Sequence, residues 1–211
     1  MDQPDNSSSL DDFFKAAYGG VPPWDIGGPQ PDLIALLEEF PPASPALDVG
    51  CGTGDLSFAL AERGLHVFGI DSAKVAIDRA KSKWRAAPRH IRQLVEFRRG
   101  DALAASKLPG PFRSVVDTGF LHLFAPPQRE QFLGELTTVL TPDARYYLLG
   151  FAVDLPVPCP GHPFRENELM AHFTAERGWR QVILRSARYV THSQLGDIDA
   201  IAACFQRSAP R

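Results

Sequence analysis

Three glycines at alternate positions, Gly50, Gly52 and Gly54, mark the stretch of the chain best suited to bind a ligand. An apolar run at 46–49 leads into them, and a helix-compatible stretch at 56–63 follows at once. Glycine reaches a positive φ without penalty and lets a ligand lie against bare backbone. The free N–H groups of the next helix face the same point. The spacing therefore predicts a turn that holds a nucleotide-like cofactor.

Two acids stand where such a cofactor needs them. Asp48 comes two residues before the first glycine, where its carboxylate can balance an ammonium group. Asp71 ends a second apolar strand, 66–71, at the separation of about 20 residues at which an acid meets ribose hydroxyls in nucleotide-binding βαβ units. The glycines run G-x-G-x-G, whereas a dinucleotide fold needs G-x-G-x-x-G. The pattern favours a cofactor with an amino-acid end; an NAD-dependent oxidoreductase is the alternative that Asp71 and the first glycines support.

Two more strand ends carry candidate residues. The stretch 95–102 is a third strand ending in Gly-Asp-Ala, and 114–122 is a fourth strand that opens into an apolar loop with His122. Ligands of open α/β sheets bind outside the carboxyl ends of the strands. His122 is therefore either a packed or capping residue or the first candidate for proton removal or substrate orientation, and Asp117 can assist.

Phe120 and Phe124 give the loop after the fourth strand an aromatic character. Two interpretations stay open: the rings form the wall of an acceptor site, or they pack beneath the helix expected at 128–140.

The four strand ends, in this order, resemble the class I S-adenosylmethionine-dependent methyltransferases. The resemblance implies an α/β fold, with a Rossmann-like, seven-stranded, mostly parallel sheet, helices on both faces and an antiparallel last strand. It implies methyl transfer from S-adenosylmethionine to S, O or N of a small molecule, with S-adenosylhomocysteine as the product. The residues that it places at the cofactor are Trp24, Gln30, Asp48, Gly50, Cys51, Gly52, Thr53, Gly54, Asp71, Ser72, Asp101, Ala102, Asp117 and Thr118.

The segment Pro-Trp-Asp-x-Gly-x-Pro-x-Pro at 23–31 resembles the thiopurine, halide, thiol and small-heterocycle methyltransferases, in which it folds over the cofactor. We therefore expect a lid at 1–31 and a methyltransferase domain at 32–211; a rigid linker with Trp24 plugged into the core is the other interpretation. Thr118 stands where thiopurine enzymes carry an arginine, which leaves the small aromatic or thiol class. The stretch 160–164 resembles a segment bordering the substrate. The expected substrate residues are Trp24, Phe120, His122, Phe124, His162 and Phe164.

Composition and charge narrow the expected number of domains, the class of partner and the compartment. The 211 residues suit one domain with a sizeable core. A net charge of -3 argues against nucleic acid as a partner. Three cysteines without metal-ligand spacing suit a reducing compartment, and no signal peptide or run of ~20 apolar residues is present. We expect a cytoplasmic monomer or homodimer that binds a small-molecule acceptor, with no metal site and no membrane contact.

The patterns also predict the remaining elements. Helices are expected at 10–18, 32–40, 73–86 with Ser72 as N-cap, 128–140 and 165–177, strands at 145–151, 181–186 and 199–207, and a loop at 103–112.

Methyl transfer from a sulfonium needs alignment more than catalytic groups. A thiol or phenol acceptor must lose a proton, whereas a pyridine-like nitrogen needs no base. Because the catalytic signature is so faint, a non-catalytic protein that keeps the cofactor pocket stays open as a second alternative.

Overall fold

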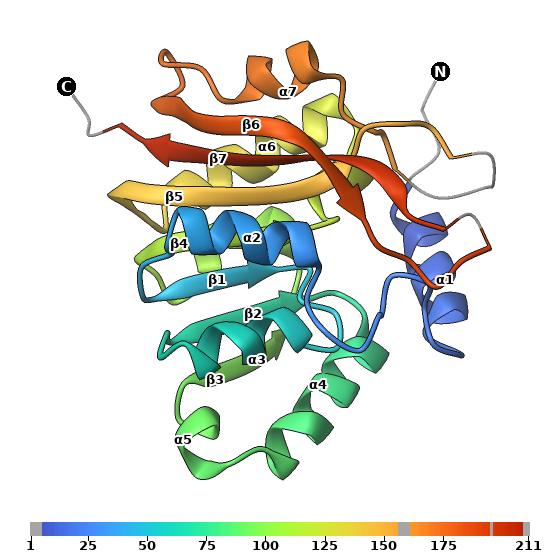
Figure 1. Cartoon of the computed structure of the whole chain (residues 1–211). Helices are drawn as coiled ribbons and strands as arrows, with labels where there is room; N and C mark the ends of the chain where they lie inside the picture. The colour runs from blue at the N-terminus through green and yellow to red at the C-terminus, as the bar shows by residue number, and fades with distance from the viewer. Residues whose placement is uncertain (1–5, 156–160, 195, 209–211) are drawn as a thin grey trace.

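The computed structural model describes residues 6–155, 161–194 and 196–208, with side chains from residue 12 onward. Its centre is a seven-stranded sheet in the order β3-β2-β1-β4-β5-β7-β6 (Figure 1). The strands are β1 (Ala46–Val49), β2 (Val67–Asp71), β3 (Val95–Arg99), β4 (Phe112–Thr118), β5 (Leu140–Phe151), β6 (Trp179–Tyr189) and β7 (Ile198–Arg207). The first five strands pair in parallel, and β7 inserts antiparallel between β5 and β6. The predicted fold class is confirmed.

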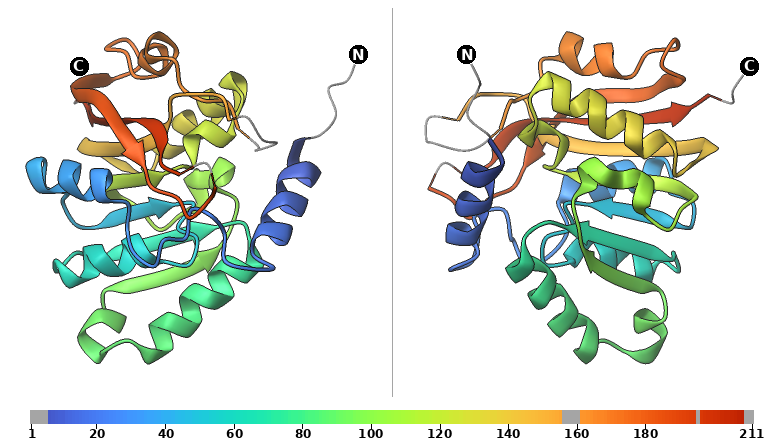
Figure 2. Two further views of the ribbon diagram at one scale, coloured as in Figure 1. Left: turned by 45° about the vertical axis from the view of Figure 1, so that its right-hand side comes forward. Right: turned by 180° about the vertical axis from the view of Figure 1, so that it is seen from behind.

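Helices cover both faces of the sheet (Figure 2). They are α1 (Asn6–Ala17), α2 (Pro31–Glu39), α3 (Asp55–Glu62), α4 (Lys74–Ala86), α5 (Arg89–Arg92), α6 (Pro126–Thr137) and α7 (Glu166–His172), with 3-10 turns η1 (Ala102–Lys107) and η2 (Leu121–Leu123). Helices α2 and α3 lie on one face and α6 on the other. Helix α1 stands apart from both layers, at the end of the sheet where the parallel strands finish.

Among the described residues, the buried apolar side chains form three clusters, and the two larger ones lie on opposite faces of the sheet. On one face, α2 buries Leu33, Leu36 and Leu37 against β5 and β7. On the other face, α6 buries Phe132 and Leu136. Full burial of each such side chain stabilises the fold by about 1.5–3 kcal/mol. The sheet is therefore fixed from both sides, and the loops at its carboxyl edge are left to build the site.

Several elements differ from the sequence prediction. Helix α4 has Ala73 at its N-cap, and Ser72 makes no capping bond, because Asp71 Oδ1 accepts a bond from the Ala73 N–H at 2.8 Å. The predicted loop 103–112 begins with η1, whose N-cap is Asp101. Strand β5 begins earlier than predicted because Leu140 pairs with Phe112 of β4.

Helix α7 also departs from the prediction, since it ends at His172 and not at 177. Turn bonds from Arg177 N to Thr174 O and from Gly178 N to Ala175 O replace the helical pattern there.

Candidate cofactor and acceptor site

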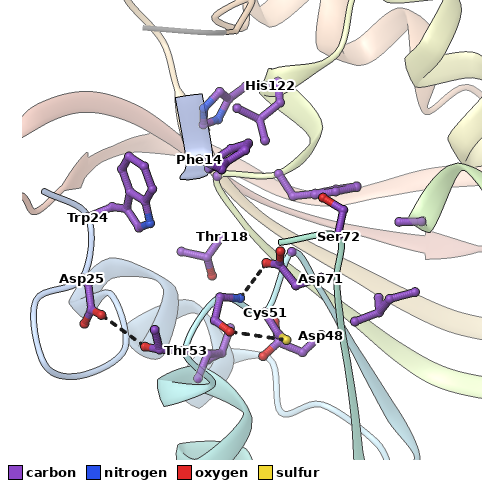
Figure 3. A pocket seen from close by; sticks show the side chains of 18 of the residues that line it. Phe14, Trp24, Asp25, Asp48, Cys51, Thr53, Asp71, Ser72, Thr118 and His122 are labelled. Carbon is purple, nitrogen blue, oxygen red and sulfur yellow. Dashed lines mark hydrogen bonds between the residues drawn. The ribbon is translucent and has the colours of Figure 1, made fainter. Parts of the chain in front are cut away.

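The carboxyl ends of the strands enclose a cavity of about 420 Å³ (Figure 3). Most residues predicted for the site line it: Trp24, Gln30, Asp48, Gly50, Cys51, Gly52, Thr53, Asp71, Ser72, Asp101, Ala102, Thr118, Phe120, His122 and Phe124. Gly54, Asp117, His162 and Phe164 are not among the lining residues. The sequence reasoning did not name Phe13, Phe14, Tyr18, Phe151 or Tyr189, which also line it.

The glycine turn after β1 has the conformation that its sequence predicts. Gly50, Gly52 and Gly54 have φ values of 64°, 54° and 89°. A Cβ on Gly50 would stand 2.8 Å from the Phe120 ring, and one on Gly54 would stand 2.5 Å from the Phe97 ring. Gly54 is therefore required for packing against β3 and not for a ligand.

Asp71 ties this turn to the end of β2. Its Oδ2 accepts a bond from Gly52 N at 2.9 Å, and its Oδ1 accepts the Ala73 N–H. Burial raises the pKa of Asp71 above its usual value, while these two N–H groups act in the opposite direction. The carboxylate keeps free lone pairs, since it lines the cavity and each oxygen has several acceptor positions.

Asp48 lies beneath the turn and is only 2% exposed. Within the part of the chain that the structure describes, its hydrogen-bond partner is Ser57, whose Oγ donates at 2.5 Å. Burial raises the pKa of Asp48 to about 7. A buried carboxylate without a cationic partner is costly, and a bound cation offsets that cost. Asp48 and the open turn therefore fit a cofactor that carries an ammonium group.

The N-terminal segment covers the cavity with aromatic rings. Trp24 packs against Phe13, Phe14 and Tyr18, with ring centroids 5.9, 5.8 and 6.1 Å apart. Trp24 also contacts the core cluster around α2, as the linker interpretation expects, and at the same time it lines the cavity. The signal missed in the sequence is the pair Phe13–Phe14, which lies within one helical turn of Tyr18.

Polar contacts hold this segment in place. Gln30 accepts a bond from Val190 N at 2.8 Å and donates one to Val190 O at 2.9 Å. Thr53 donates to Asp25 at 3.2 Å, and Arg79 of α4 donates to the carbonyl oxygens of Tyr18 and Gly20. The oxygen and the nitrogen of the Gln30 side-chain amide both bond to the backbone of Val190. Gln30 therefore anchors the N-terminal segment beside the cavity.

The far wall of the cavity is aromatic. His122 stacks on Phe151 at 4.4 Å, and Phe151 meets Tyr189 edge to face at 5.0 Å. Phe120 and Phe124 contact each other at 4.9 Å and line the cavity while also packing on Phe132 of α6. The packing interpretation of these rings is therefore confirmed, and the same two rings also form part of the cavity wall.

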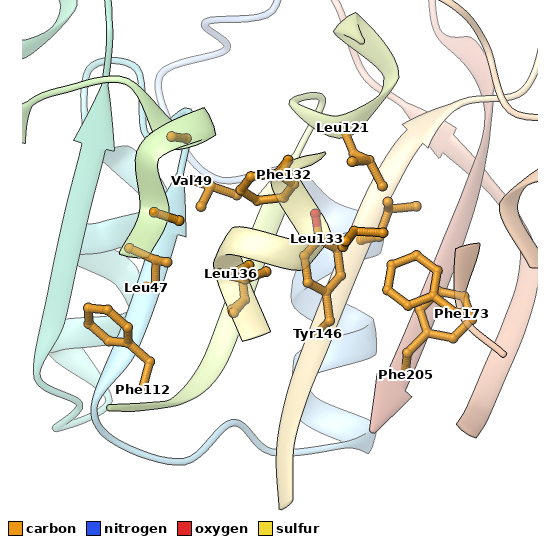
Figure 4. Close-up of a cluster of buried hydrophobic side chains, with 14 of the residues drawn as sticks. Leu47, Val49, Phe112, Leu121, Phe132, Leu133, Leu136, Tyr146, Phe173 and Phe205 are labelled. Carbon is orange, nitrogen blue, oxygen red and sulfur yellow. The ribbon is translucent and has the colours of Figure 1, made fainter. Parts of the chain in front are cut away.

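Asp117 occupies a different position from the one predicted. It is 1% exposed and accepts bonds from Phe120 N at 2.7 Å, Leu121 N at 3.0 Å and the Tyr146 hydroxyl at 2.6 Å. Figure 4 shows Tyr146 and Leu121 in the buried cluster next to α6. Burial raises the pKa of Asp117 to about 6. Its carboxylate caps η2 and fixes the loop that carries His122.

His162 and Phe164 support His122 from outside the cavity. His162 N donates to the His122 carbonyl at 2.6 Å, and its own carbonyl accepts a bond from Arg129. Phe164 is 1% exposed and meets the His122 ring edge to face at 6.4 Å. Residue 160 of the predicted substrate segment, and Cys159, lie outside the described residues.

Two kinds of feature are absent from the described residues. No cluster of three or more His, Cys, Asp and Glu side chains there is arranged to hold a metal ion. None of the helices found there combines the length and apolar character needed to cross a membrane.

Comparisons with known proteins agree with this geometry. A family model described as a methyltransferase domain matches residues 46–143. A 2-heptyl-1-hydroxyquinolin-4(1H)-one methyltransferase of Mycobacteroides abscessus is 32% identical over 176 residues, which cover 77% of this chain and 75% of that relative. The Arabidopsis thaliana protein named "Probable thiol methyltransferase 2" is 30% identical over 150 residues, or 71% of this chain and 65% of that protein.

Solved structures give the same result. A structure titled for the conversion of a disulfide bond into a thioacetal group during echinomycin biosynthesis has a TM-score of 0.81 and 26% identity, covering 98% of this chain and 93% of the other. Magnesium protoporphyrin IX methyltransferase of Synechocystis PCC 6803, solved with bound S-adenosylmethionine, shares the fold with a TM-score of 0.71 at 17% identity, covering 99% of this chain and 100% of that one. The chain therefore belongs to the class I S-adenosylmethionine-dependent methyltransferases that act on small molecules.

Proposed function

We propose that this enzyme methylates an oxygen on a small, flat, aromatic heterocycle. The observation that carries the proposal is the aromatic far wall formed by Phe120, Phe124, Phe151 and Tyr189, with His122 set into it. Aromatic side chains favour offset-stacked or edge-to-face contact with another ring, so this wall suits a planar acceptor. The similarity to a methyltransferase of a 1-hydroxyquinolinone supports the same class of acceptor.

In this proposal the two ends of the cavity have separate tasks. Asp48 balances the ammonium group of the cofactor, Asp71 accepts bonds from its ribose hydroxyls, and Asp101 and Ala102 border its adenine. When bound, S-adenosylmethionine supplies an activated methyl group on a sulfonium centre. The protein contributes alignment of the acceptor, which can remove several kcal/mol of the barrier when the geometry is right. Asp117 takes no part as a base in this proposal, since its carboxylate is 1% exposed, holds three donors and does not line the cavity.

The N-terminal segment serves as the lid in this proposal, because its rings close the cavity and its polar contacts hold it to three other parts of the chain. Deleting residues 1–31 should abolish turnover, and a fully active truncated enzyme would refute the lid.

The direct test is an acceptor screen with purified protein and S-adenosylmethionine, read by mass spectrometry. It compares 2-heptyl-1-hydroxyquinolin-4(1H)-one, unsubstituted 1-hydroxyquinolin-4-one, simple phenols, small alkyl thiols and a thiopurine. We expect methylation of the hydroxyquinolinones. Turnover confined to alkyl thiols would replace the proposal by the thiol class to which the Arabidopsis thaliana relative points. Tight S-adenosylhomocysteine binding without turnover of any acceptor would favour a non-catalytic protein.

We further propose that the enzyme acts in the cytoplasm, as a monomer or homodimer, without binding nucleic acid. The free thiols of Cys51 and Cys204 suit a reducing compartment. The net charge of -3 gives no overall attraction to phosphate.

A further inference from the structure

His122 is held firmly in the acceptor wall. Its ring stacks on Phe151, and its Cε1 and Cδ2 atoms lie against the turns at Gly119 and Gly161. A Cβ at those two glycines would stand 3.2 and 3.0 Å from these ring atoms. Because the side chain is 4% exposed and packed on several edges, its two ring nitrogens have fixed and different surroundings.

The Nδ1 atom is buried and has no hydrogen-bond partner among the described residues. It faces Gly150, where a Cβ would stand 3.5 Å from it and 2.5 Å from the Phe164 ring. The Nε2 atom is not one of the buried atoms without a partner, and His122 lines the cavity. Because Nδ1 faces Gly150 next to the Phe164 ring, we infer that Nε2 is the ring nitrogen on the cavity side.

This difference selects one tautomer. A neutral imidazole has one N–H donor and one lone-pair acceptor. A buried N–H without an acceptor is rarer and more costly than a lone pair without a donor. The proton of the neutral ring therefore belongs on Nε2, which makes His122 a hydrogen-bond donor toward the cavity.

Burial, together with one nearby cation, keeps the His122 ring neutral. The guanidinium of Arg129 on α6 donates to the carbonyl oxygens of Leu121, which precedes His122 in the chain, and of His162, whose N–H donates to the His122 carbonyl. Burial, with a smaller contribution from Arg129, lowers the pKa of His122 to about 3. A group with so low a pKa does not accept a proton from a phenol or a thiol near pH 7.

The other titratable residues near the His122 ring do not provide a base at the cavity either. Asp117 on β4 is occupied by its three donors, and Glu168 on α7 acts on Arg129. Tyr189 on β6 brings a phenol whose oxygen would stand 3.0 Å from a Cβ on Gly119. Asp117 and Glu168 do not line the cavity, so neither supplies a base at the face of His122 that meets it.

We propose that His122 donates its Nε2–H to the charged atom of an acceptor that enters the site as an anion. The inference rests on the proposed function and narrows its substrate class to acidic hydroxyl compounds, of which N-hydroxy heterocycles and electron-poor phenols are examples. The acceptor loses its proton to water before it binds, so no side chain takes that proton. His122 thereby becomes a recognition and positioning residue and not a general base.

The first experiment needs no acceptor. Nitrogen-15 spectra of the histidine side chains report tautomer and charge, and His122→Gln removes the signal to be assigned. We expect His122 to show the Nε2–H tautomer, with no protonation between pH 5 and 8. An Nδ1–H tautomer, or protonation within that range, would overturn the inference whatever the acceptor proves to be.

The second experiment measures binding of 1-hydroxyquinolin-4-one and 4-nitrophenol in the presence of S-adenosylhomocysteine. The affinity of each should rise with pH up to the acceptor's own pKa, so the midpoints differ between the two. A glutamine amide nitrogen can reach the place of Nε2, so His122→Gln should retain affinity within a few-fold. His122→Phe should weaken binding about 10- to 100-fold, the loss expected for one hydrogen bond to a charged group.

The outcomes separate the two proposals. A midpoint shared by both compounds would reveal a titrating protein group and overturn the inference. Equal binding to His122→Phe and the wild type would do the same. Binding of neither compound would refute the proposed acceptor class, and the nitrogen-15 spectra would still decide the tautomer.

Discussion

The two ends of the cavity satisfy their polar groups in opposite ways. At the cofactor end, carboxylates bond the protein's own backbone and hydroxyls: Asp71 holds Gly52 and Ala73, Asp101 holds Leu103, and Asp48 holds Ser57. At the proposed acceptor end, His122 Nδ1 is buried inside the aromatic wall without a partner among the described residues. Thr118 Oγ1, from a residue that the family resemblance places at the cofactor, is likewise buried without a partner there.

The difference suggests a division of labour. The cofactor end is built before the ligand arrives, which lowers the entropy cost of binding it. The acceptor end depends on packing between distant elements, and few of its groups are committed in advance. The following predictions test this contrast, from the largest expected effect to the smallest.

Gly50→Ala should damage the cofactor end most. The new Cβ would meet Phe120 at 2.8 Å in a backbone with φ of 64°, which adds overlap to conformational strain. We expect a loss of about 3–5 kcal/mol in the free energy of unfolding, with S-adenosylhomocysteine binding abolished. Chemical denaturation and calorimetric titration measure both quantities.

Gly64→Ala is the matched control. Gly64 has a φ of 84°, but a Cβ there would meet nothing within 4 Å. The variant should therefore lose only the free energy of unfolding that corresponds to conformational strain, about 1–2 kcal/mol. Equal losses in the two variants would mean that the contact with Phe120 is unimportant.

Asp71→Ala should weaken S-adenosylhomocysteine binding by roughly 1–3 kcal/mol, because hydrogen bonds to a charged group are lost. Asp71→Asn keeps one acceptor oxygen for a backbone N–H, so its affinity for S-adenosylhomocysteine should lie between those of Asp71→Ala and the wild type. Calorimetric titration gives the affinities, and unchanged affinity in Asp71→Ala would remove the ribose assignment.

Asp48 should make stability depend on pH. Its pKa is about 7 in the folded protein against 3.8 as the ordinary value, so the folded state binds the proton more tightly. The contribution of protonated Asp48 to the free energy of unfolding should therefore be fully present below about pH 4 and be lost as the pH rises toward about 7. Asp48→Asn lacks this loss, so between pH 4 and 8 its free energy of unfolding should rise relative to that of the wild type by on the order of 4 kcal/mol.

Cofactor binding should respond to pH in the opposite direction. Wild-type affinity for S-adenosylhomocysteine should fall as pH drops below about 7, because protonated Asp48 cannot balance an ammonium group. Asp48→Asn should bind weakly at every pH. A wild-type affinity that does not change between pH 5 and 8 would contradict the role of Asp48.

Arg79→Ala should have the smallest effect on cofactor binding, since it removes only a contact between α4 and the N-terminal segment. Arg79 donates to Gly20 O at 3.0 Å and to Tyr18 O at 2.8 Å, and its guanidinium lies 5.9 Å from the Tyr18 ring. We expect S-adenosylhomocysteine to dissociate about 3- to 10-fold faster, measured by stopped-flow fluorescence with Trp24 as reporter. Arg85→Ala, an exposed change on the same helix, should leave the rate unchanged.

The sequence by itself determined the sheet, the glycine turn and the acids at the ends of the parallel strands. These features are local: a strand, its final residue and the turn that follows are adjacent in the chain, and the carboxyl ends of parallel strands must meet at one edge. The cavity lining includes Asp48, Asp71 and Asp101 for that reason.

Only the tertiary structure decided what the other candidates do. Asp117 caps η2 because unpaired N–H groups lie within its reach, and Gly54 is needed because Phe97 arrives from β3. Tyr18 and Tyr189, from opposite ends of the chain, meet at one cavity. Spacing along a chain cannot foresee which buried donor finds which acceptor, because that depends on how distant elements pack.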